Sequence, residues 1–191
     1  MKEIEKYLAS YFGIGGKDLS SVGALFKKSR IQKNEYVLRQ DQYSRNLSFI
    51  ETGYLRVSAP DKHGVKQITQ WIAGPGEFIV DLSSFVFGTP SRWDIAALTE
   101  CTVHSIGQED YKDLHLFVKN WPEIEKLFLT KCFLTMEQRI FNLLSMTAEE
   151  KYLEFFNVNP EIFNQVPLQY LASMLGMTPE TLSRIRKKMI S

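Results

Sequence analysis

Apolar and polar residues alternate along this chain with two periods, one typical of helices and one typical of strands. Near the start, Ile4, Leu8 and the pair Tyr11-Phe12 fall on one helical face. This spacing predicts that the chain opens with an amphipathic helix. Between about residues 35 and 105 the period becomes two, and in the run 54–59 apolar residues alternate one by one with more polar ones. That period is typical of strands with one buried face.

The alternating region contains several short strands separated by turn residues. The runs 54–59 and 66–72 flank the turn Asp61-Lys62-His63-Gly64, and Gly74-Pro75-Gly76 breaks the next connection. The run 94–106 supplies further strand-forming sequence. Short strands at this spacing predict a small antiparallel β-barrel or β-roll.

After Ile106 the apolar residues recur with the period of a helix. Asn120 at the N-cap position, Pro122 in the first turn and Glu123 at the third position predict a helix from Asn120 to about Met146. This long helix carries two apolar stripes, which are Leu127, Leu134 and Phe141 in the first and Leu129, Phe133, Met136, Ile140 and Leu143 in the second.

A helix that is apolar on two faces is stable when both faces are buried. We expect one stripe to pack on the β region. The second stripe, from Leu129 to Leu143, is then expected to pair with the same helix of a second subunit in a homodimer. The alternative is a central helix buried within the core of a monomer. Beyond this helix, Thr147-Ala148-Glu149-Glu150 is a capping box that starts a new helix, which ends at Asn157-Val158-Asn159-Pro160.

The segment 166–188 meets the steric requirements of a helix-turn-helix. Its first helix has a small residue, Ala172, where the second helix crosses it, and Gly176 lies in the turn, where a positive φ is needed. Thr178 is a natural N-cap for the second helix, with Pro179 at its first position. The inward-facing residues are Leu171, Leu175, Leu182 and Ile185.

The outward side of the second helix, residues 178–189, carries side chains suited to DNA. Arg184 can bond a guanine edge in two places, and Glu180 can accept from the N4 amino group of cytosine. The lysines can neutralise phosphates, and residues at the start of the first helix lie where it crosses the DNA backbone. The predicted DNA-binding set is Gln169, Tyr170, Thr178, Glu180, Thr181, Ser183, Arg184, Lys187 and Lys188. A plain helical hairpin and a degenerate helix-turn-helix remain alternatives.

Charge supports DNA binding only at the end of the chain. The whole protein has a formal net charge of +1. From Thr178 to Ser191, however, four basic side chains stand against the single acid Glu180. Such an excess attracts a phosphate backbone. A solvated helix face would show the same excess.

Cysteine usage and hydropathy indicate a cytoplasmic protein. Cys101 and Cys132 lie far apart and lack ligand-like spacing. We therefore expect two buried free thiols, and neither a disulfide, a zinc site nor an iron–sulfur centre is supported. The N-terminal sequence lacks the apolar core of a signal peptide, and no apolar run reaches membrane length. We expect no membrane association.

The order of these parts resembles the CRP/FNR family of bacterial transcription regulators. The resemblance rests on SFIETGYLRV (48–57), GPGEFIVDL (74–82), AALTECTVHSI (96–106) and LASMLGMTPETLSRIRKK (171–188). It implies a homodimer that reads a palindromic site in double-stranded DNA and contacts RNA polymerase.

The resemblance also implies a fold class and three domains. The fold class is α+β: an antiparallel β-roll of the cyclic-nucleotide-binding type (a double-stranded β-helix or jelly roll) with flanking helices, a long dimerisation helix and a small all-α helix-turn-helix domain. Residues 1–118 are expected to form the β-roll sensor domain, 119–146 the dimerisation helix and 147–191 the DNA-binding domain. The chain ends at Ser191 without the β-hairpin wing of many relatives.

Two departures from the family pattern concern the ligand and the base preference. Cyclic-AMP-binding members have a Gly-Glu-Leu triplet for the ribose and an Arg-Ser pair for the phosphate. Here the triplet reads Val80-Asp81-Leu82, and Arg92 is followed by Trp93 and the acidic Asp94. These five residues, Val80, Asp81, Leu82, Arg92 and Trp93, are the candidate ligand pocket, for a small-molecule effector other than cyclic AMP or for none. In the recognition helix, Pro179 replaces the usual arginine, which predicts a different base preference.

The sequence therefore predicts a dimeric DNA-binding transcription regulator that cyclic AMP does not control. The alternative is a module that senses a small molecule or binds a protein, with a helical hairpin that does not bind DNA. An enzyme is not supported, because the sequence shows no nucleophile with its base, no metal-ligand spacing and no phosphate-binding glycine loop.

Overall fold

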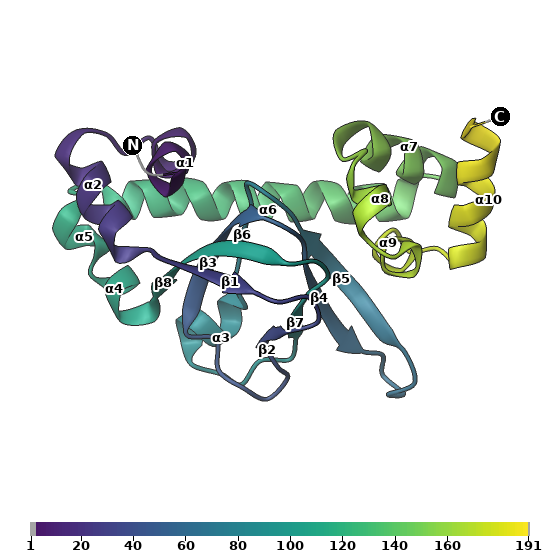
Figure 1. The fold of residues 1–191 in the computed structure, drawn as a ribbon, viewed down its shortest axis with the longest axis horizontal. Helices are drawn as coiled ribbons and strands as arrows, with labels where there is room; N and C mark the ends of the chain where they lie inside the picture. Colours follow the sequence, from purple (N-terminus) through teal and green to yellow (C-terminus); the bar gives the residue numbers. More distant parts are fainter. Residues whose placement is uncertain (1–2, 191) are drawn as a thin grey trace.

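The chain is organised along one long helix, α6 (Trp121–Ser145). In the computed structural model, which describes residues 3–190, a β-roll lies beside the middle of α6 (Figure 1). Helices from the N-terminal third gather at one end of α6, and the last four helices gather at the other end. The N- and C-terminal helices α1 and α10 therefore lie at opposite ends of the molecule.

The β-roll consists of two four-stranded antiparallel sheets that share one core. The strand orders are β1-β8-β3-β6 and β2-β7-β4-β5. The strands are β1 (Lys27–Ile31), β2 (Tyr36–Leu38), β3 (Asn46–Thr52), β4 (Leu55–Pro60), β5 (Gln67–Ala73), β6 (Phe78–Ile79), β7 (Asp94–Ala97) and β8 (Cys101–Gly107). Their inward residues, among them Ile50, Leu55, Val57 and Val103, form a single buried cluster between the sheets.

The strands predicted from alternation are confirmed, with one refinement. The runs 54–59 and 66–72 become β4 and β5, which pair across the predicted turn. The run 94–106 is not one strand. It is divided at residues 98–100 into β7 and β8, which belong to different sheets. The chain crosses between the sheets here, and alternation alone does not show where a strand changes sheet.

The N-terminal helices cover the outer face of the first sheet. The predicted opening helix is confirmed as α1 (Glu3–Phe12), in which Ile4, Leu8 and Phe12 are buried, whereas Tyr11 is exposed. These side chains share a core with Phe49 of β3 and with Trp121 of α6. The short helices on this side and beside the roll are α2 (Gly16–Leu25), α3 (Leu82–Phe87), α4 (Gln108–Lys112) and α5 (Leu114–Phe117).

The predicted bounds of the long helix are confirmed, but its predicted cap is wrong. Asn120 occupies the N-cap position, yet its side chain accepts no capping hydrogen bond. Its backbone, at φ −102° and ψ 25°, is outside the extended region from which an N-cap side chain reaches the first turn. The capping box at Thr147 is confirmed: its hydroxyl accepts from the Glu150 amide, and Glu150 accepts from the Thr147 amide.

The last four helices form a compact unit that also touches the roll. They are α7 (Ala148–Val158), α8 (Ile162–Gln165), α9 (Leu168–Met174) and α10 (Pro179–Ile190). Their core includes Tyr152, Leu171 and Leu182, and it is joined by Ile72 and Leu98 from the roll. The predicted fold class is thereby confirmed: α+β, with an antiparallel β-roll, flanking helices, a long helix and a small all-α unit.

Candidate nucleic-acid interface and ligand sites

The turn between α9 and α10 is closed by its own backbone hydrogen bonds. The Met177 amide donates to the Ala172 carbonyl over 3.0 Å, and the Gly176 amide donates to the Ser173 carbonyl over 3.1 Å. This pair of bonds is the Schellman motif, which needs a left-handed residue after the helix. Gly176 supplies it at φ +68°. The positive φ that the sequence predicted at Gly176 is therefore confirmed.

The second helix is held in place by a cap and by two buried aliphatic side chains. The Thr178 hydroxyl accepts from the Thr181 amide over 3.2 Å, as predicted for an N-cap. Leu182 and Ile185 are buried against Leu171 and Ala172 of α9. Since these contacts fix α10 on α9, the residues on the other side of α10 face outward.

Most of the DNA-binding residues predicted on and just before α10 are accessible to solvent in this structure. Thr178, Glu180, Arg184, Lys187 and Lys188 are exposed, and Thr181 and Ser183 are half-buried. A hydrogen bond from its own backbone amide, followed by the contact with Thr178, lowers the pKa of Glu180. The carboxylate is thus ionised and can act as an acceptor. Among residues 3–190, no side chain forms a hydrogen bond or ion pair with Arg184.

The side chains of Arg186 and Lys188, near the end of α10, contact other helices of the unit. The Lys188 Nζ lies 2.8 Å from the Glu149 Oε1, at the start of α7. This pair is exposed, and exposed pairs contribute only about 0–1 kcal/mol, so a phosphate could displace Glu149. Arg186 lies on a different side of α10 and donates to Asn164 of α8 over 3.5 Å.

The start of α9 packs against the β-roll, which the sequence does not indicate. Gln169 is exposed, but the Tyr170 ring lies beneath the Arg56 guanidinium at 4.0 Å. One turn further along α9, the Ser173 hydroxyl accepts from the Thr69 amide of β5 over 2.9 Å. Because β5 is an edge strand, this bond satisfies an amide that would otherwise be open. A DNA contact made by the Tyr170 ring would compete with Arg56.

The five candidate pocket residues of the β-roll lie around the start of α3 and the strand β7. Asp81 is buried, and its carboxylate accepts from the Ser84 amide, which makes it the N-cap of α3. Arg92 is exposed and stacks over the Trp93 ring at 4.6 Å. Trp93 itself packs on the core of the roll, Val80 is half-buried and Leu82 is exposed. Neither of the two cavities described in this structure is lined by any of the five.

The expectation that one apolar stripe of α6 packs on the β region is wrong. All members of both stripes are exposed in the single chain, for example Phe133 at 70% and Phe141 at 62%. The α6 residues that pack on the rest of the chain are Trp121 and Ile124, with Phe128 partly buried. They occupy a third face, and that face becomes polar in the second half of the helix at Gln138 and Asn142. An apolar periodicity could not reveal it.

The two cysteines are free, but only one is buried. Cys101 is buried in the β-roll, whereas Cys132 is exposed on α6, so the expectation of two buried thiols is wrong for Cys132. Cys132 lies one turn beyond Phe128, which is itself only partly buried, and the packing there leaves the thiol exposed.

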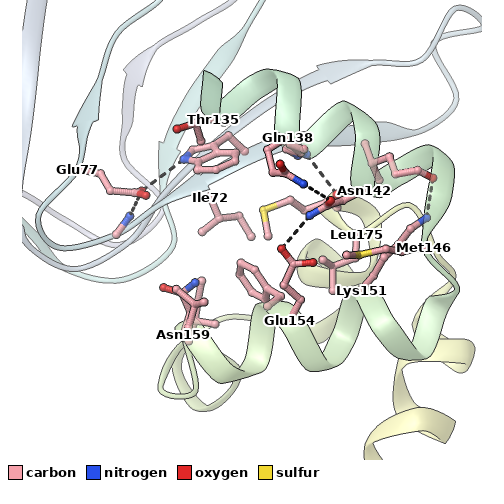
Figure 2. A pocket seen from close by; sticks show the side chains of 18 of the residues that line it. Ile72, Glu77, Thr135, Gln138, Asn142, Met146, Lys151, Glu154, Asn159 and Leu175 are labelled. Atoms are coloured by element: carbon pink, nitrogen blue, oxygen red, sulfur yellow. Dashed lines mark hydrogen bonds between the residues drawn. The ribbon is translucent and has the colours of Figure 1, made fainter. Parts of the chain in front are cut away.

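A cavity of about 650 Å³ lies between the β-roll and the helical unit. Its walls come from the β4–β5 region and the loop after β5, from the second half of α6, from α7 and from the end of α9. Figure 2 shows Ile72 and Leu175 among its apolar residues and Gln138, Asn142 and Glu154 among its polar ones. Sequence reasoning missed this site. Its one signal was the spacing of Thr135, Gln138 and Asn142, which gives α6 a polar stripe.

None of the helices in residues 3–190 has the length and apolarity to cross a membrane. In the same range, no group of three or more histidine, cysteine, aspartate or glutamate side chains is arranged to hold a metal ion.

Comparison with known families shows that the β-roll is similar to a known type of domain. Residues 28–116 match the family model of the cyclic nucleotide-binding domain. No curated protein sequence matches the chain. The match covers the strands from β1 to β8 together with α3 and α4, so the part of the chain between the N-terminal helices and α6 is similar to this domain.

Solved structures extend the likeness to nearly the whole chain. FixK2 of Bradyrhizobium japonicum is 16% identical with a TM-score of 0.70, covering 86% of this chain and 84% of its own. The c-di-GMP responsive global regulator CLP of Xanthomonas campestris is 17% identical with a TM-score of 0.66, covering 90% of each chain. The catabolite activator protein of Thermus thermophilus is 17% identical with a TM-score of 0.58, covering 93% and 84%. At these identities the likeness shows a shared fold.

Despite the similarity to a cyclic nucleotide-binding domain, we expect cyclic AMP not to bind. The Asp81 carboxylate is engaged as the cap of α3, Val80 adds a side chain where the cyclic-AMP-binding relatives have glycine, and Arg92 lies on Trp93. Calorimetric titration of the full chain with cyclic AMP should show no binding at micromolar concentrations. A dissociation constant in the low micromolar range would contradict this expectation.

Proposed function

We propose that this protein is a DNA-binding transcription regulator of the CRP/FNR type rather than an enzyme. It reads a palindromic DNA site as a homodimer, with α10 as the recognition helix, and acts on transcription through RNA polymerase as the family resemblance implies. Its DNA contacts come from the outward side of α10 and the start of α9, and cyclic AMP does not control it.

The observation that carries this proposal is the outward side of α10. Arg184 and Glu180 lie one helical turn apart, exposed, on a helix whose opposite face is locked onto α9 by Leu182 and Ile185. A guanidinium and a carboxylate in this position match the donor and acceptor edges of bases in the major groove. Thr178 and Lys187 flank them at the two ends of the helix, where phosphates would lie.

The dimeric part of the proposal is supported by the exposed second stripe of α6. Leu129, Phe133, Met136, Ile140 and Leu143 recur at alternating spacings of four and three residues. This is the spacing of a coiled-coil seam. All five are exposed in the single chain, so a partner helix would bury apolar side chains that are otherwise in water.

Selection of bound sequences from a random DNA pool tests this function. Repeated rounds of binding to the full chain should enrich an inverted repeat whose half-site centres are separated by one helical turn, ~34 Å. The double variant Glu180→Ala, Arg184→Ala serves as the matched control and should enrich no common sequence. If the wild-type protein enriches nothing, or only single half-sites, the proposed dimeric regulator is wrong.

A further inference from the structure

The cavity between the β-roll and the helical unit has an unusual wall. The side of α6 that faces the rest of the chain is apolar in its first half, at Trp121 and Ile124. In its second half the same side presents Thr135, Gln138 and Asn142 to the cavity. A helix side that packs directly on its neighbours is normally apolar throughout. Where a polar helix side faces apolar residues across a cavity, its hydrogen-bonding groups are available to a molecule bound in that cavity.

Hydrogen bonds link three polar side chains of the cavity wall, and each side chain donates to the next, from Gln138 through Asn142 to Glu154. The Gln138 Nε2 donates to the Asn142 Oδ1 over 2.7 Å, and the Asn142 Nδ2 donates to the Glu154 Oε1 over 2.8 Å (Figure 2). The chain of bonds therefore runs from an amide to a carboxylate and uses one of the two N–H groups of each amide. Beside the second N–H of each amide, the network offers acceptor oxygen to the cavity, on the Glu154 carboxylate at one end and on the Gln138 carbonyl at the other.

The opposite side of the cavity is apolar. The charged side chains that line the cavity as a whole are equal in number for the two signs. Ile72 of β5, Phe155 of α7 and Leu175 after α9 contribute apolar surface. The two acids Glu77 and Glu154 stand against the two bases Arg139 and Lys151. Arg139 is also held in place, because it donates to the Met174 carbonyl and lies 5.0 Å from the Trp71 ring.

We propose that this cavity binds a small uncharged molecule with an aromatic or aliphatic body and an N–H or O–H donor at its edge. The balanced charges favour no net charge, the apolar surface favours the body, and the acceptor oxygens favour the donor. A volume of about 650 Å³ lies within the ~300–1,000 Å³ range of small-molecule sites. The site is separate from the candidate pocket around Asp81. Of the second apolar stripe of α6, only Leu143 borders the cavity.

A bound molecule would touch the β-roll, α6, α7 and the end of α9 at once. It would therefore stabilise the arrangement in which α9 packs on β5 through Ser173 and Thr69. Probe fluorescence and melting temperature, the two measurements that test this binding, are made without DNA, so their outcome is independent of the proposed DNA binding.

The test uses N-phenyl-1-naphthylamine, an uncharged aromatic probe with one N–H whose fluorescence rises in apolar sites. We expect saturable binding to the full chain and a rise in the melting temperature with probe concentration. Gln138→Trp places a large ring in the cavity and should weaken probe binding at least about tenfold. Thr130→Trp, an exposed change on α6 that does not line the cavity, is the matched control and should leave probe affinity unchanged.

A second filling variant keeps the test decisive if Gln138→Trp fails to fold. Val158→Trp fills the cavity from α7, at a side chain that is largely exposed, and it should weaken the probe in the same way. Circular dichroism confirms the fold of each variant. Absence of saturable binding to the wild-type protein, or equal probe affinity in the wild type and both filling variants, overturns the proposal. The second result would place the probe on the exposed stripes of α6.

Discussion

Replacing Met136 and Ile140 with glutamate should convert the protein from a dimer into a monomer. Both side chains belong to the second stripe of α6, and both are exposed in the single chain. In a dimer the two changes remove four buried apolar side chains, each of which contributes about 1.5–3 kcal/mol. The loss exceeds about 6 kcal/mol, which weakens dimerisation roughly 10⁴-fold or more. Light scattering measures the mass directly.

The first apolar stripe provides a matched control for this experiment. Leu127→Glu with Phe141→Glu introduces the same charges on the same helix, at side chains that are as exposed as those of the second stripe. This variant should keep the dimeric mass. A dimer that survives Met136→Glu with Ile140→Glu, or that dissociates only in the control, would show that the second stripe is not the interface.

Replacing Arg184 with alanine should weaken binding to the selected DNA site far more than binding to random DNA. A bidentate contact between arginine and guanine contributes ~1–3 kcal/mol at each half-site. Two half-sites in a dimer lose about 2 kcal/mol or more, so affinity for the selected site should fall about 30-fold or further. Preference should relax at one base position per half-site, and binding to random DNA should change little. Titrations of both DNAs at several salt concentrations measure this.

Two further variants separate base reading from charge. Lys187→Ala should weaken specific and random DNA about equally and should lower the salt slope by ~0.9 for each phosphate that is no longer neutralised. Arg30→Ala, an exposed arginine on β1 of the roll, is the control for removal of one positive charge and should leave both affinities unchanged. Equal weakening of specific and random DNA by Arg184→Ala would show that Arg184 does not read a base.

Local rules in the sequence determined the turn between α9 and α10, the start of α7 and the alternation of β4. Gly176, Thr178 and the inward residue Leu182 act through contacts within a few residues or with the neighbouring helix. The capping box at Thr147 is a four-residue device, and the alternation in β4 depends only on which side of the strand faces the core. Such features could be predicted because the groups that satisfy them are close in sequence.

Two side chains of the candidate sites have partners that the sequence analysis did not predict. The Asp81 carboxylate caps α3 through the nearby Ser84 amide, and this cap was missed because no helix was expected at residues 82–87. Arg56 and Tyr170 are far apart in the sequence, and only the packing of α9 on the roll brings them together.

The faces of α6 show the division between sequence and tertiary structure most clearly. The sequence determined that α6 is a long helix with two apolar stripes, because a helix has a fixed period of about 3.6 residues. Only the tertiary structure decided that neither stripe is buried against the rest of the chain, and that the side that faces it becomes polar at Gln138 and Asn142 around a cavity. Periodicity records how polar each face is, but which surface covers a face depends on elements distant in the chain.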